Sequence, residues 1–326
     1  MAEVTILGAG VAGLWAARAL LTHGIRPRIL DRSGPPGPHA CSWWAGGMLA
    51  PHCEGALSEA SVVTHGATAA AAWSKVTEVH RNGTLVLALD RDRTELEHFA
   101  ARTTGHQQVT SGEIAKLVPH LAERHRHGLF FANEAHLIPR EALTSLVTSL
   151  ANEGVTVQRI EAQPDDLTGT VLDCRGIAAQ NDLPELRPVR GEMMMLRSSE
   201  IELSRPVRLL HSRHTLYIVP HGNGLFMLGA TQIESSANGP VTARSALELL
   251  SAAYALDPRF GEAEIVEFGA DLRPAFPDNV PRITQRGHVL HLNGLFRHGY
   301  LMAPALASQV ATFITTSKKG DLFHED

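Results

Sequence analysis

The stretch Gly8-Ala9-Gly10-Val11-Ala12-Gly13 decides the fold of this chain. An apolar run, Val4 to Leu7, precedes it and predicts a buried parallel strand, and Leu14 to Leu21 after it predicts a helix. In such a turn the first glycine permits the sharp bend, the second lets the backbone approach a pyrophosphate, and the third lets helix and strand pack closely. The start of the helix then supplies amide donors to the phosphates.

An acidic residue follows at the place where a dinucleotide site needs one. A second short strand, Arg28 to Leu30, runs into Asp31, eighteen residues past Gly13. Such a carboxylate accepts hydrogen bonds from the ribose hydroxyls of the cofactor. A glycine pattern alone is a weak signal, but strand, turn, helix, strand and acid in this order predict an adenine-dinucleotide site. The pattern does not choose between NAD and FAD.

The composition is that of a globular enzyme with two domains. The chain has 326 residues, of which 44% are hydrophobic and 19% charged, and its net charge of −5 favours neither nucleic acid nor an anionic membrane as a partner. No apolar run in the sequence approaches the length of a membrane span. Cys41, Cys53 and Cys174 form no CxxC pair, which suits a reducing compartment. We therefore expect a cytoplasmic enzyme.

The middle of the chain changes character and indicates a second, antiparallel domain. From about Val189 short apolar strands alternate with turns, and residues 221–224 predict a hairpin between Leu216–Pro220 and Leu225–Gly229. A helix is expected over Ala243–Leu256. We expect an α/β fold with an α+β insert. Its Rossmann-like cofactor-binding domain would comprise residues 1–75, 135–185 and 265–326, and its antiparallel-sheet substrate-binding domain residues 76–134 and 186–264.

The segment from Asn293 to Ala305 is a second candidate site. It leads from the predicted strand Val289–Leu292, through a loop with Gly294, into a helix expected to begin at about Pro304. The positive end of that helix points at whatever the loop binds, and a reduced flavin carries negative charge near its N1 and O2 atoms. The segment therefore favours a flavin over a nicotinamide.

Six motifs, taken in order, resemble the D-amino acid oxidase-like family of FAD enzymes, and within it most of all the glycine oxidases of thiamine biosynthesis. They are the opening turn with Asp31, AGGMLAP at 45–51, LYIVP at 216–220, LGAT at 228–231, ADLRP at 270–274 and GLFRHGYLMAPA at 294–305. The resemblance covers most of the chain and implies that family's fold, an FAD domain with an antiparallel substrate domain. It also implies non-covalent FAD, because covalently flavinylated relatives carry a tethering cysteine near this last motif and this chain has none there.

The resemblance implies cofactor contacts from several parts of the chain. The turn residues lie along the pyrophosphate, the acidic strand end lies at the adenosine ribose, two short segments follow the flavin, and the last loop wraps its pyrimidine side. These residues are Gly8, Gly10, Val11, Ala12, Gly13, Asp31, Arg32, Cys41, Ser42, Gly46, Gly47, Met48, Leu295, Phe296, Arg297, His298, Gly299, Tyr300 and Leu301.

Three further roles are implied at the substrate. Arg273 matches the arginine that clamps the substrate carboxylate, Tyr217 the hydroxyl that assists it, and Arg297 a second arginine at the substrate mouth. The chemistry agrees, because an arginine fork binds a carboxylate at two points and so fixes the Cα–H over the flavin. Gln232 stands where glycine oxidases can carry methionine, which we expect to make the pocket more polar.

The expected reaction is FAD-dependent oxidation of glycine to an imine that yields glyoxylate and ammonia, with molecular oxygen reduced to hydrogen peroxide, for thiazole synthesis in thiamine production. Sarcosine and small D-amino acids stay open as substrates, and so does a dehydrogenase that avoids oxygen. A non-catalytic FAD-binding subunit is the alternative from another class, and the set Arg273, Tyr217 and Arg297 argues against it. The oligomeric state, including a homo-oligomer, is left open.

The histidine-bearing stretches do not predict a metal site. His52, Cys53 and Glu54 are contiguous, so their side chains do not converge easily on one ion. His120, His125 and His127 are expected on a solvated helix face. We therefore expect no metal.

Overall fold

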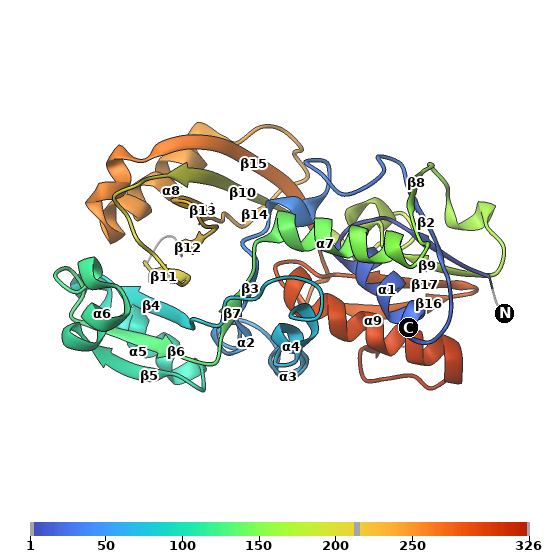
Figure 1. The fold of residues 1–326 in the computed structure, drawn as a ribbon, viewed down its shortest axis with the longest axis horizontal. Helices are drawn as coiled ribbons and strands as arrows, with labels where there is room; N and C mark the ends of the chain where they lie inside the picture. Colours follow the sequence, from blue (N-terminus) through green and yellow to red (C-terminus); the bar gives the residue numbers. More distant parts are fainter. Residues whose placement is uncertain (1–2, 212–215, 325–326) are drawn as a thin grey trace.

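The computed structural model describes residues 3–211 and 216–324, and two large sheets lie side by side in it (Figure 1). The first sheet has the strand order β18-β16-β17-β9-β1-β2-β8. Its strands are β1 (Val4–Leu7), β2 (Arg28–Asp31), β8 (Val157–Arg159), β9 (Thr170–Asp173), β16 (Arg282–Arg286), β17 (Val289–Asn293) and β18 (Phe323–His324). The strands from β17 to β8 are parallel, which confirms the predicted Rossmann-like unit.

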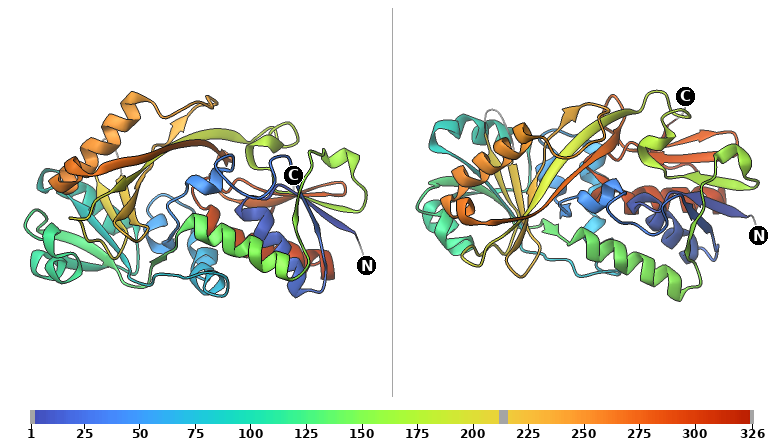
Figure 2. Two further views of the ribbon diagram at one scale, coloured as in Figure 1. Left: turned by 45° about the horizontal axis from the view of Figure 1, so that its top comes forward. Right: turned by 90° about the horizontal axis from the view of Figure 1, so that it is seen from above.

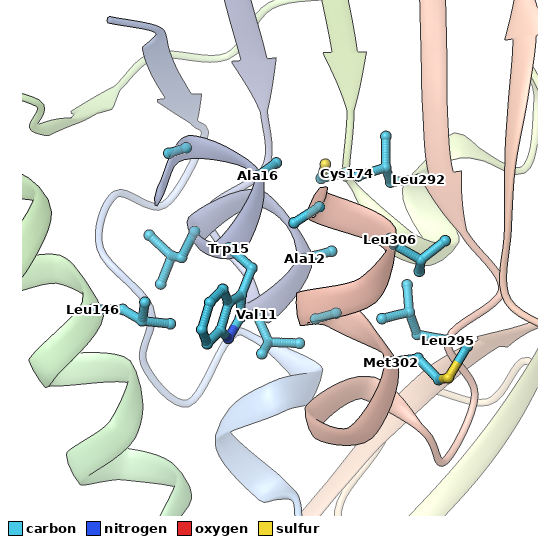
Figure 3. Packing of buried hydrophobic residues seen from close by; sticks show 14 of the residues in the cluster. Val11, Ala12, Trp15, Ala16, Leu146, Cys174, Leu292, Leu295, Met302 and Leu306 are labelled. Carbon is cyan, nitrogen blue, oxygen red and sulfur yellow. The ribbon is translucent and has the colours of Figure 1, made fainter. Parts of the chain in front are cut away.

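Helices α1 (Val11–Thr22), α7 (Pro139–Asn152) and α9 (Gly299–Thr316) pack on one face of the first sheet. Figure 3 shows α1 between the other two, with Trp15 beside Leu146 of α7 and with Leu306 of α9 in the same core. The opposite face has a thinner cover, made by two side chains of the segment after β8. There Ala162 and Leu167 pack against Leu7, Leu30, Val171 and Val289.

Helix α9 begins at Gly299, so the start expected at about Pro304 is wrong by one and a half turns. Pro304 has no amide to donate to the carbonyl of Tyr300, four residues earlier. Trp73 of α4 (Ala69–Trp73) replaces that donor, because its Nε1 lies 2.7 Å from the Tyr300 carbonyl oxygen. A neighbouring side chain thus lets the helix run through its proline.

The second sheet is mostly antiparallel and has the order β14-β10-β13-β12-β11-β4-β6-β5, with β15 paired to β10. Its strands are β4 (Thr84–Ala88), β5 (Gln107–Thr110), β6 (His127–Phe131), β10 (Arg187–Arg197), β11 (Val207–Leu210), β12 (Leu216–Pro220), β13 (Leu225–Gly229), β14 (Ile233–Glu234) and β15 (Glu264–Ala275). Strands β12 and β13 form the predicted hairpin, and β11 pairs with β4 in parallel.

The strand β15 belongs to the second sheet, whereas the sequence assigned residues from 265 onward to the cofactor-binding part. Its partner β10 runs beside it over its whole length, from Arg187 opposite Ala275 to Arg197 opposite Glu264. Both strands are long and extend from the second sheet toward the first (Figures 1 and 2). The chain therefore returns to the first sheet only after Ala275, at β16.

The faces of the second sheet follow the alternation of its residues. Met194 packs with Leu249 of α8 (Ala243–Leu256) on one face. Met193 and Met195 lie on the other face with Tyr217. The run of three methionines is therefore core packing, as its alternation predicts. Trp44 and Met48 also pack on the Tyr217 face of the sheet.

Short elements connect these layers. They are η1 (Cys41–Trp44), β3 (Met48–Leu49), α2 (Pro51–Glu54), α3 (Ala60–Gly66), η2 (Asp90–Asp92), α5 (Arg93–Arg102), α6 (Ser111–Leu117), η3 (Pro119–Leu121), β7 (Ala135–His136), η4 (Pro164–Asp166), η5 (Gly176–Ala179) and η6 (Pro258–Glu262). Within residues 3–211 and 216–324, no helix has the length and apolarity needed to cross a bilayer.

Candidate functional site

A cavity of about 490 Å³ lies where the two sheets meet, and residues from both line it. Its walls include all the predicted cofactor and substrate residues except Gly13. They are Gly8, Gly10, Val11, Ala12, Asp31, Arg32, Cys41, Ser42, Gly46, Gly47, Met48, Tyr217, Arg273, Leu295, Phe296, Arg297, His298, Gly299, Tyr300 and Leu301. Segments almost three hundred residues apart thus share one site of a size that suits a small-molecule ligand.

One end of the cavity is built from backbone around the opening turn. A Cβ on Gly13 would lie 1.9 Å from the carbonyl oxygen of Gly8, so only glycine allows α1 to meet its strand here. Val11 and Ala12 line the cavity, and their first-turn amides have no backbone acceptor within the described ranges. Unpaired amides at a helix start fit a pyrophosphate, whose oxygens would accept from them.

Asp31 is held beside this helix start by two backbone amides. Its Oδ2 accepts from the Ala9 amide at 2.9 Å, and its Oδ1 accepts from the Ser33 amide at 2.8 Å. These bonds fix the carboxylate in the cavity wall and leave lone pairs for further donors. The arrangement fits the ribose hydroxyls of an adenine dinucleotide.

The second helix start faces the same cavity. Gly299, Tyr300 and Leu301, in the first turn of α9, line it, and their amides have no backbone acceptor in the part of the chain that the structure describes. The Tyr300 hydroxyl is engaged elsewhere, because it donates to the Ser42 carbonyl oxygen at 3.0 Å. It therefore ties α9 to the loop that carries Cys41. The positive helix end fits the negative charge of a reduced flavin ring.

Phe296 precedes this helix in a conformation that bulky side chains rarely adopt. Its φ is +43°, and its amide donates to the carbonyl oxygen of Pro274 at 2.8 Å. That bond joins the loop to the end of β15, close to Arg273. Left-handed backbone in a bulky residue persists only where its surroundings impose it, and such residues gather at functional sites.

Arg273 of β15 lines the cavity, as does Asp271 two residues earlier, whose carboxyl pKa is raised by burial against the lowering effect of the Arg273 charge. Its Nη1 donates to the Thr231 carbonyl oxygen at 2.9 Å, and no carboxylate lies within ion-pair distance of it in residues 3–211 and 216–324. The guanidinium lies directly on the backbone of Gly191, where a Cβ would be 2.2 Å from Nη2. An arginine placed in this way can bind a carboxylate at two points.

Tyr217 lies on β12, which β10 and β13 separate from β15. It stands opposite Gly229 in the β12–β13 pair, two residues before the Thr231 carbonyl that holds Arg273. Its ring packs against Gly46, whose Cβ would lie 2.9 Å from Tyr217 Cε2. The hairpin and the 46–48 segment thus position the tyrosine in the same wall as the arginine.

Arg297 also lines the cavity, but a carboxylate already holds it. Its Nη2 and Nε each lie 2.8 Å from an oxygen of Glu54, at the end of α2. Arg208 of β11 approaches the same carboxylate with its Nη2 at 3.2 Å, and His298 Nδ1 lies 3.5 Å from it. We call Glu54, Arg208, Arg297 and His298 the Glu54 cluster.

The charges in the Glu54 cluster are set by their neighbours. Burial alone would raise the pKa of Glu54, but Arg297, Arg208 and His298 together lower it to about 2. Burial, with help from the two arginines, lowers the pKa of His298 to about 4 despite Glu54. At neutral pH the cluster therefore holds a carboxylate, two guanidiniums and a neutral imidazole.

Sequence reasoning missed Glu54 and Arg208. The run His52-Cys53-Glu54 points to Glu54 only as a metal ligand, whereas its partners come from β11 and the loop before α9. Arg208 interrupts the buried strand Val207–Leu210 and is itself only 2% exposed. Arginine is almost never buried without a partner, so its place inside an apolar strand is the signal that could have found it.

Two further sequence expectations are wrong. Gln232 is exposed and does not line the cavity, because Thr231 and Ile233 take the inward positions of this short extended segment. His125 is not solvated: it is fully buried, and its two ring nitrogens lie 3.2 Å from the carbonyl oxygens of Ala88 and Leu256. The carbonyl oxygens supply the hydrogen-bond partner that a buried imidazole needs.

A dinucleotide turn on one sheet, an unpaired arginine on the other and a flavin-compatible helix start between them define a flavin-dependent oxidoreductase. The chain belongs to the DAO family of FAD dependent oxidoreductases, whose model matches residues 3–312. FAD is therefore its cofactor.

Named relatives have similar sequences along nearly all their length. The chain is 49% identical over 319 residues to the "Putative thiamine biosynthesis oxidoreductase ThiO" of Rhizobium etli, with 97% of each chain covered. It is 28% identical over 365 residues to a glycine oxidase of Pseudomonas aeruginosa, covering 96% of this chain and 94% of the relative.

Solved structures show the same fold. The crystal structure of glycine oxidase from Geobacillus kaustophilus superposes with a TM-score of 0.81 at 21% identity, over 99% of this chain and 96% of that one. An iminodiacetate oxidase from Chelativorans superposes with a TM-score of 0.79 at 22% identity, over 98% of this chain and 96% of that one. At these identities the likeness concerns the fold alone.

Proposed function

We propose that this enzyme oxidises glycine, with FAD as the immediate oxidant and molecular oxygen as the final one. Glycine, oxygen and water would yield glyoxylate, ammonia and hydrogen peroxide. The observation that carries this proposal is Arg273, a cavity-lining guanidinium with no carboxylate partner in the described ranges. A substrate carboxylate would supply that partner. Relatives named glycine oxidase, and one named for thiamine biosynthesis, support glycine as substrate and thiamine production as the pathway.

The protein's own residues would act mainly by positioning. Arg273 would bind the carboxylate at two points, and the Tyr217 hydroxyl would add a third contact from β12. When bound, FAD accepts the hydrogen of the Cα–H bond with both of its electrons, and water then hydrolyses the imine. Because the hydrogen leaves Cα together with its electron pair, no base in the walls has to remove a Cα proton, and the substrate reacts with its amine neutral.

The Glu54 cluster would keep the other arginine in place. Because Glu54 binds Arg297 through both oxygens, Arg297 cannot swing across to compete with Arg273 for the carboxylate. Arg208 of β11 donates to the same carboxylate. In this proposal Arg273 and Tyr217 contact the substrate, and Glu54 is a positioning residue for Arg297.

A substrate comparison tests the proposal. Purified holoenzyme is mixed with glycine, sarcosine or D-alanine, and both anaerobic loss of flavin absorbance and aerobic peroxide formation are measured. We expect the highest kcat/KM for glycine, with one peroxide formed for each glyoxylate. A preference for D-alanine, or no bleaching with any of the three, would contradict glycine as the substrate. Bleaching without peroxide would instead identify a dehydrogenase.

A further inference from the structure

Arg175 occupies an unexpected place at the end of β9. The preceding residue, Cys174, touches the dinucleotide turn, because its carbonyl oxygen would lie 2.6 Å from a Cβ on Gly8. The Arg175 side chain lines the cavity and is 14% exposed. A charged side chain thus lies next to the cofactor turn, where the glycine pattern predicts contacts from backbone groups only.

Two carboxylates hold the Arg175 guanidinium in position. Its Nε and Nη2 donate to the two oxygens of Asp173 at 2.9 and 2.8 Å, and Nη2 also donates to Asp182 at 2.6 Å. Burial would raise the pKa of Asp173, but hydrogen bonds from Arg175 and His291 lower it to about 2. The carboxylate is therefore ionised at working pH, and the arginine is rigidly oriented.

The donors of Arg175 are not all used by the carboxylates. Nη1 donates to Gln163 Oε1 at 2.7 Å, so one of the five N–H groups stays without an acceptor among the described residues. Because Asp173 and Asp182 more than balance the positive charge, the group is a poor match for a phosphate. It suits a neutral ligand surface with acceptor atoms, such as a purine and its ribose.

The bond to Gln163 spans the end of the first sheet. In the strand order β9-β1-β2-β8, Arg175 follows the first of these strands and Gln163 follows the last. Between them lie the ends of β1 and β2, with the opening turn and Asp31. Ala162 and Gln163 both line the cavity on this side. The Arg175–Gln163 bond therefore joins two parts of the cavity wall near its Asp31 end.

We propose that Arg175 and Gln163 form a clasp over the adenosine half of FAD. The spare Nη1 hydrogen and the flat guanidinium face meet the adenosine, and the bond to Gln163 fastens residues 160–163 across it. The clasp does not touch the flavin or the substrate. Its effect is on how long FAD stays bound, and it does not depend on which amine the enzyme oxidises.

The test is the rate at which the holoenzyme releases FAD after dilution, followed by the rise in flavin fluorescence. Gln163→Ala removes the acceptor and leaves the arginine with both carboxylates. We expect release to quicken about three- to tenfold, the range for one hydrogen bond. Gln158→Ala is the matched control, since Gln158 is an exposed glutamine in β8 that does not line the cavity. It should release FAD at the wild-type rate.

Two more variants separate the clasp from local structure. Gln163 also caps the short helix η4, so Arg175→Lys is needed: it keeps the cap and a positive charge but loses the forked geometry. We expect it to quicken release as Gln163→Ala does, while Gln163→Glu, which retains an acceptor, restores the wild-type rate. Unchanged release in Gln163→Ala would overturn the proposal. So would equal quickening in Gln163→Ala and Gln158→Ala, and so would wild-type release in Arg175→Lys.

Discussion

The two ends of the cavity are built from different materials. At the Asp31 end, the groups that fit the cofactor are mostly backbone amides of α1, placed by a glycine turn and one carboxylate. At the Arg273 end they are charged side chains that reach the cavity from α2, β11, β15 and the loop before α9. A site built from backbone groups tolerates little change in local shape, whereas a site built from charged side chains depends on which charges form ion pairs with each other.

The largest effect should come from crowding the backbone end. Gly13→Ala places a Cβ 1.9 Å from the Gly8 carbonyl, so α1 must move away from β1. We expect FAD binding to weaken at least hundredfold, because overpacking of this kind costs about 3 kcal/mol. The ratio of flavin to protein absorbance in the purified variant measures it. Gly112→Ala is the control, since nothing lies within 4 Å of a Cβ there, and retention of FAD by Gly13→Ala would refute this account of the turn.

An intermediate effect should come from unpairing the Glu54 cluster. Glu54→Gln leaves the Arg208 and Arg297 guanidiniums without their carboxylate, and breaking a buried pair in this way costs about 3 kcal/mol. We expect a lower free energy of unfolding and a KM for glycine raised about tenfold, since freed Arg297 competes for the substrate. The flavin content should stay that of the wild type.

The lowered pKa of Glu54 determines how the stabilising effect of the Glu54 cluster changes with pH. The pKa of Glu54 is about 2 in the folded protein, below its ordinary 4.5. The cluster therefore stabilises the fold fully above pH 4.5, and this contribution is lost as the pH falls toward 2. Denaturant unfolding should give a lower free energy of unfolding for Glu54→Gln than for the wild type at pH 7, and a smaller difference between the two at pH 3. Glu59 is exposed, so the control Glu59→Gln should have the wild-type free energy of unfolding at both pH values. If the loss of stability in Glu54→Gln were the same at pH 7 and pH 3, the charge of Glu54 would be excluded as its cause.

A smaller effect should follow from moving Arg273 without removing it. Gly191→Ala places a Cβ 2.2 Å from Arg273 Nη2, and a flexible side-chain end can shift at little cost to folding. We expect the KM for glycine to rise about fivefold, or about 1 kcal/mol, with unfolding and FAD content unchanged. Steady-state kinetics measure it, and an unchanged KM would show that the backbone of Gly191 does not position the guanidinium.

The difference between the two ends also explains what the sequence could predict. The turn, its flanking strands and Asp31 lie within some thirty residues, so local spacing was enough. The hairpin at 221–224 and helix α8 were likewise local and are confirmed. The family likeness then located Arg273 and Tyr217 on the cavity wall, which spacing alone does not do.

The missed features all depend on contacts between distant parts of the chain. The start of α9 at Gly299 relies on Trp73 to satisfy a carbonyl that Pro304 leaves free. The membership of β15 in the second sheet depends on its pairing with β10, about eighty residues earlier. Glu54 and Arg208 form their ion pair only because folding brings α2 and β11 together. A single sequence states none of these pairings.

The most direct test of the account is the response of Arg273→Ala at both ends of the cavity. The KM for glycine and the dissociation constant of FAD are measured on the same preparation. We predict a KM raised at least tenfold, about 1.4 kcal/mol or more, with FAD binding unchanged. An unchanged KM would remove Arg273 from the substrate site, and an equal loss of FAD affinity would show that the two ends are not separate.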